Sequence, residues 1–209
     1  MQMALWTAAM RFWQDVPAGE NGQTPGSWLV LSPHIGAPLV FESSAMQPIT
    51  PQHIRSSFVN ASRSEAAKLN LPKDFDSLDW ESLDFLGWRD ERMPLRGYLV
   101  VPGPDGLTGI MLRAPEGGAR KNRSVLCELC RDVFSKEDVL LWVAKRAGQS
   151  GRDGNTVGTL ICADFLCCGN VRKEPPANEI NPDPAAVVLR QIEGLMERTA
   201  QFLARVQAR

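Results

Sequence analysis

Apolar and polar positions follow different patterns in successive parts of the chain. Up to residue 45, Pro and Gly interrupt the sequence every few positions and no period is sustained. From Met46 the pattern becomes regular, with helical spacing first, then short apolar runs typical of strands, and helical spacing again at the end. We therefore divide the chain into an irregular extension at 1–45 and a folded region at 46–209. Met46 is a candidate natural start, and a genuine extension at 1–45 is the alternative.

Two short helices are predicted at the beginning of the regular region. Thr50 is a suitable N-cap, Pro51 takes the first helical position, and Ile54 lies on the buried face. Ser62 and Glu65 form an S-x-x-E capping box that opens a second helix.

The middle of the chain indicates β structure. Residues 97–114 contain two apolar runs around Gly-Pro-Asp-Gly, a pattern that predicts a hairpin. Two further strands are expected at 138–148 and 155–164, joined by a glycine-rich link, and a short helix is expected to begin within 163–172.

A long amphipathic helix is predicted at about 184–207, with Asp183 as N-cap and Pro184 at its first position. Its apolar positions recur at intervals of three and four: Val188, Ile192, Leu195, Thr199, Phe202 and Val206. We interpret this stripe as packing against the sheet, with a coiled-coil face as the alternative. The elements together predict an α+β fold of short N-terminal helices, an antiparallel sheet and a long C-terminal helix.

The composition, with 44% hydrophobic and 22% charged residues, is typical of a soluble globular protein rather than a disordered one. The formal net charge of −1 gives no global field that would favour nucleic acid or a membrane. No apolar run approaches the ~20 residues needed to span a bilayer, and no secretory signal is recognisable. We therefore expect a cytoplasmic protein whose five cysteines are reduced, which favours metal ligation over disulfides.

The cysteines form two groups with the spacing of a structural zinc site. Cys127 and Cys130 make C-x2-C, and after 31 intervening residues Cys162 pairs with either Cys167 or Cys168. The first pair suits a knuckle, and the second runs from a strand end to a helix start, where thiolates are stabilised. This layout predicts a treble-clef finger at about 123–173 that holds one structural Zn²⁺, without the open position of a catalytic site.

Cations are expected near four thiolates on zinc, which carry a net charge of −2. Residues 113–173 hold eleven Lys or Arg against seven Asp or Glu. The candidates for this surrounding shell are Arg131, Lys145, Arg146, Arg152, Arg172 and Lys173. The same basic excess supports an alternative function, a zinc finger that binds ribosomal RNA or another nucleic acid.

Catalysis is not indicated, and we predict no catalytic residues. The chain has two histidines, and it lacks nucleophile-elbow, P-loop and dinucleotide-binding motifs. Asp79, Asp84 and Asp90 lie in an acidic run at 74–91, and only a tight cluster of these carboxylates in a pocket would suggest an enzyme. We expect Arg89 and Asp90 to form a charge pair beside Trp88.

Several blocks resemble the FBP-domain family, the C-terminal treble-clef zinc finger of elongation factor G-binding, FusB-type fusidic-acid-resistance proteins. These blocks are "ITPQHIRSSFVNASRSEAAKLNLP", "LDFLGWRDERMPLRGYLVV", "CELC", "GNTVGTLICADFLC" and the terminal helix, and together they span about 46–209. The stand-alone actinobacterial members resemble this chain closely. The N-terminal helical bundle of the resistance proteins has no counterpart here, because residues 1–45 are too short to replace it.

The resemblance implies a zinc site and a partner. It implies that the ligands are Cys127, Cys130, Cys162 and Cys167, which leaves Cys168 as a spare thiol. It also implies binding to elongation factor G at the ribosome and an influence on its release, as in fusidic-acid resistance.

Positions that contact a partner are predicted from physical chemistry. Interfaces on small domains combine aromatic anchors with basic rims. Phe134 is the first candidate, followed by Lys145 and Arg146 at a strand end, and by Arg152 and Asn155 in the glycine-rich link.

Overall fold

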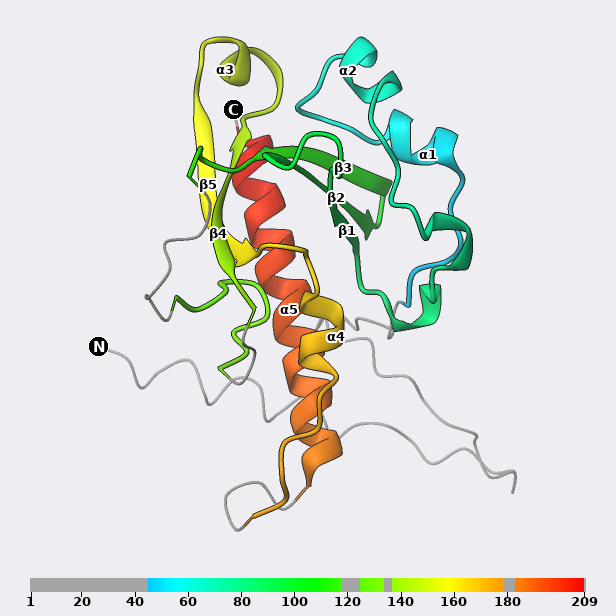
Figure 1. Ribbon diagram of the computed structural model, residues 1–209, viewed down its shortest axis with the longest axis vertical. Coiled ribbons are helices and arrows are strands. Elements are labelled where there is room, and N and C mark those ends of the chain that lie inside the picture. The colour runs from blue at the N-terminus through cyan, green and yellow to red at the C-terminus, as the bar shows by residue number, and fades with distance from the viewer. Residues whose placement is uncertain (1–44, 118–124, 134–136, 179–182, 209) are drawn as a thin grey trace, which may run out of the picture. The chain divides into compact units, whose positions relative to one another are not determined.

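The computed structural model describes residues 45–117, 125–133, 137–178 and 183–208. Most of the predicted extension at 1–45 therefore lies outside the described residues. The described region contains a five-stranded antiparallel sheet in the order β1-β2-β3-β4-β5, combined with helices (Figure 1). The strands are β1 (Leu86–Arg89), β2 (Arg96–Gly103), β3 (Gly106–Arg113), β4 (Val139–Lys145) and β5 (Thr156–Cys162). The predicted α+β fold is confirmed.

The two N-terminal helices begin where the capping signals predicted. In α1 (Pro51–Ser56), the backbone N–H of His53 donates to the Thr50 side chain. In α2 (Arg63–Ala67), both hydrogen bonds of the Ser62–Glu65 capping box are present. Each cap satisfies backbone donors that have no partner within the helix, which explains why such short helices form.

The predicted hairpin is formed by β2 and β3, whose last pair is Gly103 with Gly106. Gly106 has a φ of 108°, which only glycine adopts without strain, so the chain can reverse over two residues here. Alternate residues of β2 serve opposite faces. Tyr98 and Val100 join an apolar cluster with α1, whereas Leu99 joins the cluster that contains the cysteines.

The acidic run at 74–91 contains two 3-10 turns (Phe75–Ser77 and Trp80–Ser82) and the strand β1, which was not predicted. The prediction of an ion pair between Arg89 and Asp90 is wrong. Asp90 is buried and accepts hydrogen bonds from Tyr98 and from the Arg92 and Met93 amides, while Arg89 donates to the Pro94 carbonyl.

The glycine-rich link between β4 and β5 contains a short helix, α3 (Gly148–Arg152), that was not predicted. A side chain at Gly151 would place its Cβ 1.8 Å from the Arg146 carbonyl oxygen, so the turn requires glycine at this position. Residues rich in Gly and Ser have low helix propensity, but local hydrogen bonds support this turn, since the Asp153 amide donates to the Gln149 carbonyl and the Asn155 amide to the Ser150 carbonyl.

The C-terminal helix α5 spans Pro184–Gln207, with Asp183 accepting from the Ala186 amide, as predicted. It runs beside β4 and β5 in Figure 1. It buries Leu195, Phe202, Leu203 and Val206 in the cluster that contains the cysteines, and Thr199 is also buried, which confirms packing onto the domain. In the described part of the chain, no helix is long and apolar enough to cross a bilayer.

Candidate metal centre

The first two cysteines lie in a tight knuckle that is hydrogen-bonded to the edge strand of the sheet. The Arg131 amide donates to the Cys127 carbonyl at 2.9 Å, which closes the turn, and Arg131 adopts a left-handed φ of 53°. The Glu128 amide donates to the Leu160 carbonyl at 2.8 Å, so the knuckle is attached to β5. These bonds turn the Cys127 and Cys130 side chains toward the interior, where both are buried.

The second pair bridges a strand end and a helix start. Cys162 is the last residue of β5, and Cys167 is the first residue of α4 (Cys167–Val171). Between them Phe165 has a left-handed φ of 59° and packs its ring on Trp142, with centroids 4.9 Å apart. The aromatic contact anchors the loop, so the two cysteines are held on one side of it.

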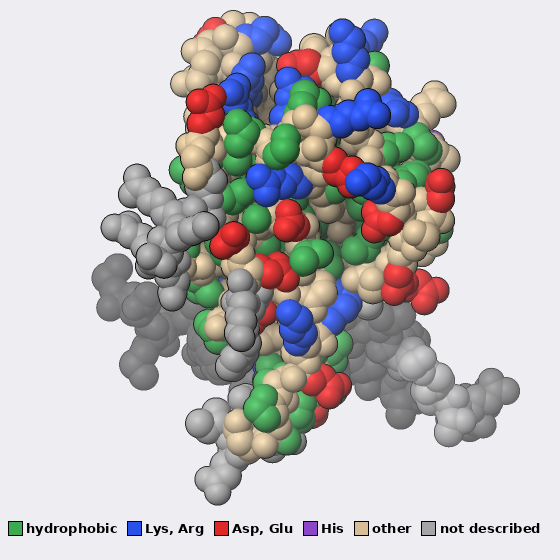
Figure 2. Space-filling view, viewed as in Figure 1, with side chains coloured by type: hydrophobic (Ala, Val, Ile, Leu, Met, Phe, Trp, Pro, Cys, Tyr) green, Lys and Arg blue, Asp and Glu red, His purple; other side chains and the backbone are tan. Residues whose placement is uncertain are grey.

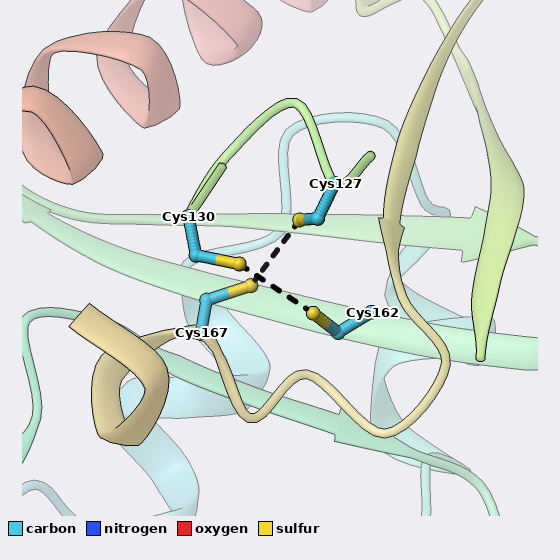
Figure 3. Close-up of side chains that lie close together, drawn as sticks. All are labelled: Cys127, Cys130, Cys162 and Cys167. Carbon is cyan, nitrogen blue, oxygen red and sulfur yellow. Dashed lines mark hydrogen bonds between the residues drawn. The ribbon is translucent and has the colours of Figure 1, made fainter. Parts of the chain in front are cut away.

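The four sulfur atoms form a compact cluster with tetrahedral dimensions (Figure 3). All of them lie within 4.8 Å of one another, and the Cys127–Cys167 and Cys130–Cys162 Sγ separations are 3.7 Å. Zinc–sulfur bonds of ~2.3 Å in a tetrahedron require sulfur–sulfur distances of ~3.8 Å. The cluster therefore fits one Zn²⁺, with four buried ligands and no position left for substrate.

The pKa values of the four thiols in the cluster differ strongly. The pKa of Cys127 lies far below its usual value because nearby thiols, Cys130 first, hydrogen bond to its thiolate. The pKa of Cys167 is raised because of its hydrogen bond with Cys127 and then with the other two thiols, followed by burial. The pKa of Cys130 is also lowered and that of Cys162 is raised, so Cys127 and Cys130 ionise more readily, while Cys162 and Cys167 retain their protons until a divalent cation replaces them.

Polar side chains surround the sulfurs. The Asn170 amide donates to Cys162 Sγ at 3.6 Å and lies 4.0 Å from Cys130 Sγ. Lys173 donates in turn to Asn170 Oδ1 at 2.7 Å, which orients that amide and brings a positive charge toward the thiolates. Of the predicted cationic shell, Lys173 is thus placed to act through Asn170.

A cation that was not predicted, Arg198 of α5, also approaches the centre. Its Nε donates to the carbonyl oxygen of Leu129, inside the knuckle, at 2.7 Å. Burial first, and then the charge of Arg131, lowers the pKa of Arg198, while the Cys130 and Cys127 thiolates act in the opposite direction. Arg198 is 68 residues away from Cys130 in the sequence, so only the folded chain shows this contact.

Three further residues of the predicted shell, Arg172, Lys145 and Arg146, are engaged elsewhere. Arg172 forms a two-pronged bond with Asp84, at 2.6 and 3.0 Å. Lys145 pairs with Thr156 at one end of the β4–β5 ladder, and Cys162 pairs with Val139 at the other. The two ends are six residue steps apart along the strand, or ~20 Å, so Lys145 and the adjacent Arg146 are not neighbours of the metal.

Cys168 is directed away from the other four cysteines. It accepts from the Asp84 amide at 3.4 Å and donates to the Phe85 carbonyl at 3.6 Å. Burial, followed by the charge of Asp84, raises the pKa of Cys168 to about 11. Cys168 is therefore a neutral thiol that ties α4 to the start of β1.

Four of the five predicted partner-contact residues lie together. Phe134 is outside the described residues. Lys145, Arg146, Arg152 and Asn155 gather around α3, and the Arg146 amide donates to the Asn155 carbonyl at 2.9 Å. Figure 2 shows Lys and Arg side chains concentrated at this end of the domain, over α2 and α3. These four residues thus form one surface, rich in basic side chains, at the end of β4 and β5 that lies far from the zinc cluster.

The three aspartates considered for catalysis do not converge. Asp84 pairs with Arg172, and Asp90 is enclosed by Tyr98, Asn70 and two backbone amides. A cavity of about 810 Å³ lies beside β1 and α4, and of the three aspartates only Asp90 is among its described lining residues. These three aspartates therefore do not form the tight cluster in a pocket that would suggest an enzyme.

A knuckle and a strand-to-helix pair that share one structural zinc define the class of treble-clef zinc fingers. The chain belongs to the FBP C-terminal treble-clef zinc-finger family, whose model matches residues 53–206. A search of curated proteins found no match. Among solved structures, the chain is similar to "the fusidic acid resistance protein FusC", with 19% identity and a TM-score of 0.44. That similarity covers 61% of this chain and 53% of the FusC chain.

Proposed function

We propose that this protein binds translation elongation factor G in the cytoplasm and influences release of the factor from the ribosome, as fusidic-acid-resistance proteins of this type do. Membership of the FBP zinc-finger family, whose match at 53–206 covers nearly the whole described region, is the observation that carries the proposal. The zinc centre supports it, because it ties the knuckle, β5, α4 and α5 into one surface.

The protein acts by binding rather than by covalent chemistry. The metal has four buried protein ligands, and the three aspartates considered for catalysis have other partners or lie apart. A binder of this kind shifts the factor between conformations by preferring one of them. Release of the factor then requires only a difference in affinity between its ribosome-bound and free forms.

Co-purification with purified elongation factor G tests this function. The zinc-loaded full chain, immobilised through a tag, should retain the factor when no nucleic acid is present. The Cys127→Ser variant, which removes one ligand, should retain much less. Absence of retention by the zinc-loaded chain would refute the proposal.

An RNA-binding finger is the second candidate, because of the basic surface around α3. Contacts with phosphate release counterions, so RNA affinity would fall steeply between about 0.1 M and about 1 M salt. If ribosomal RNA binds the chain tightly and elongation factor G does not, the RNA function is favoured.

A further inference from the structure

A groove of about 730 Å³ runs between the zinc knuckle, the outer face of β4 and β5, and α5. It differs from the basic surface around α3 because its walls come from the knuckle and the helix. Three arginines line it: Arg131 from the knuckle, and Arg198 and Arg205 from α5. We propose that this groove binds an acidic, extended segment of a protein partner. The proposal rests on the proposed function, since the segment would belong to elongation factor G.

Positive charge dominates the groove. Glu128 is the one acidic side chain among its described lining residues, and it lies 3.8 Å from Arg131. The side chains of Glu128 and Arg131 are more than half exposed, at 54% and 56%, so water screens their attraction. Arg131 can therefore leave Glu128 and bind the carboxylate of a ligand. Within the described chain, neither Arg198 nor Arg205 forms an ion pair.

The negative charge of the zinc-bound thiolates explains the position of only one of these three arginines. Arg198 is bound to the knuckle carbonyl of Leu129 and faces the zinc ligands. Arg205 lies seven residues further along α5, a rise of ~10.5 Å, and its guanidinium stacks over the Phe202 ring at 5.6 Å. Arg205 and the exposed Arg131 are therefore the two cations positioned for a ligand.

The floor of the groove is apolar and has few bulky side chains. Leu141 is 45% exposed there, and Leu160 is half-buried beside it. Gly158 contributes no side chain, and a Cβ at that position would lie 3.2 Å from Leu141 Cδ1. The floor thus offers apolar contact to an extended chain whose carboxylates reach the arginine walls.

Two observations favour a peptide over a nucleic acid. The described lining residues include no aromatic side chain on which bases could stack. Among the described strands, β5 is at the edge of the sheet and pairs only with β4, so its outer edge, apart from the Leu160 carbonyl that accepts from Glu128, can receive an extended peptide. Arginine is also the side chain best suited to two-pronged binding of carboxylates at interfaces.

Peptide binding by the zinc-loaded full chain tests the groove. The probe is a fluorescent peptide of alternating Glu and Leu, and its anisotropy is compared with that of an oligo-uridine of similar length. Arg131→Gln and Arg205→Gln should each weaken peptide binding about fivefold. Arg190→Gln, on the same helix but outside the groove, should stay within about twofold of wild type. Zinc content measured on every variant confirms that the metal centre is intact.

The outcomes separate this groove from the proposed function. Loss of peptide affinity in the two groove variants alone supports the proposal. No peptide binding by the wild-type chain, equal affinity in all variants, or tighter binding of oligo-uridine overturns it. Elongation factor G is then titrated with the same proteins. If the wild-type chain binds the factor and the groove variants bind it equally well, the groove fails while the proposed function stands. If the wild-type chain binds the peptide but not the factor, the proposed function fails.

Discussion

At the residue scale, adjacent cysteines have opposite roles. Cys167 and Cys168 are both buried in the first turn of α4, yet only Cys167 directs its sulfur into the cluster. Neighbouring residues on a helix are separated by ~100° around its axis, so one of the two must turn away. Cys168 instead bonds to the backbone at Asp84 and Phe85.

Serine substitutions should separate these roles. Cys168→Ser should retain one zinc per chain and lose only about 1–2 kcal/mol of unfolding free energy, because a small buried polar group replaces the thiol. Cys167→Ser should lose the metal and the cooperative thermal transition, because the zinc supplies folding free energy directly. Metal analysis and thermal unfolding measure both effects. Equal zinc content in the two variants would show that the ligand assignment is wrong.

Tyr98 is the only tyrosine of the chain, so its ionisation can be followed without interference from other tyrosines. Burial, and then its hydrogen bond to Asp90, raises the pKa of Tyr98 to about 12 from 10.0. The folded state therefore binds more protons than the unfolded state between these values, and the stability contributed by Tyr98 falls as pH rises through this range.

Titration of tyrosinate absorbance should show a midpoint near pH 12 in the folded protein and near pH 10 after denaturation. Asp90→Asn should move the folded midpoint downward without reaching the unfolded value, because burial remains the larger cause. A folded midpoint near pH 10 in the wild-type chain would contradict the buried Tyr98–Asp90 hydrogen bond.

At the element scale, two glycines in short helices provide a matched test of packing. A Cβ at Gly151 of α3 would overlap the Arg146 carbonyl, whereas a Cβ at Gly169 of α4 would meet nothing within 4 Å. Gly151→Ala should cost about 2 kcal/mol or more in unfolding free energy, and Gly169→Ala should be neutral or slightly stabilising. Denaturant unfolding of the two variants measures the difference. Similar unfolding free energies would show that α3 does not pack as described.

The helix starts could be predicted because their signals are local. Thr50, Ser62 and Asp183 each bond to an amide three residues later, so a few letters of sequence contain the whole interaction. The long apolar stripe of α5 and the knuckle spacing are similarly short-range. These features were enough to predict the class of fold and the metal.

What could not be predicted depends on contacts distant in sequence. Strand β1 lies in an acidic run without clear alternation, and it forms because β2 pairs with it. The contacts of Arg198 and Asn170 with the metal centre bring together α5, α4 and the knuckle. The resemblance to a known family, rather than spacing, was needed to choose Cys167 over Cys168.

At the scale of the whole molecule, the zinc centre is part of the larger apolar cluster. Its four cysteines pack with Trp142, Ile161, Leu195 and Phe202, so sheet and terminal helix meet at the metal. Removal of zinc should therefore lower the thermal transition of the whole domain rather than loosen the knuckle alone. A chelator titration followed by circular dichroism measures this effect. An unchanged transition after complete metal removal would contradict a structural role for zinc.

The central claim is that a zinc-organised surface of this domain recognises elongation factor G. Calorimetric titration of the purified factor with the full-length Cys167→Ser and Cys168→Ser variants and the wild-type chain tests it most directly. We predict that wild type and Cys168→Ser bind with the same affinity and that Cys167→Ser does not bind. Failure of the zinc-loaded wild-type chain to bind, or equal binding by all three proteins, would contradict the claim.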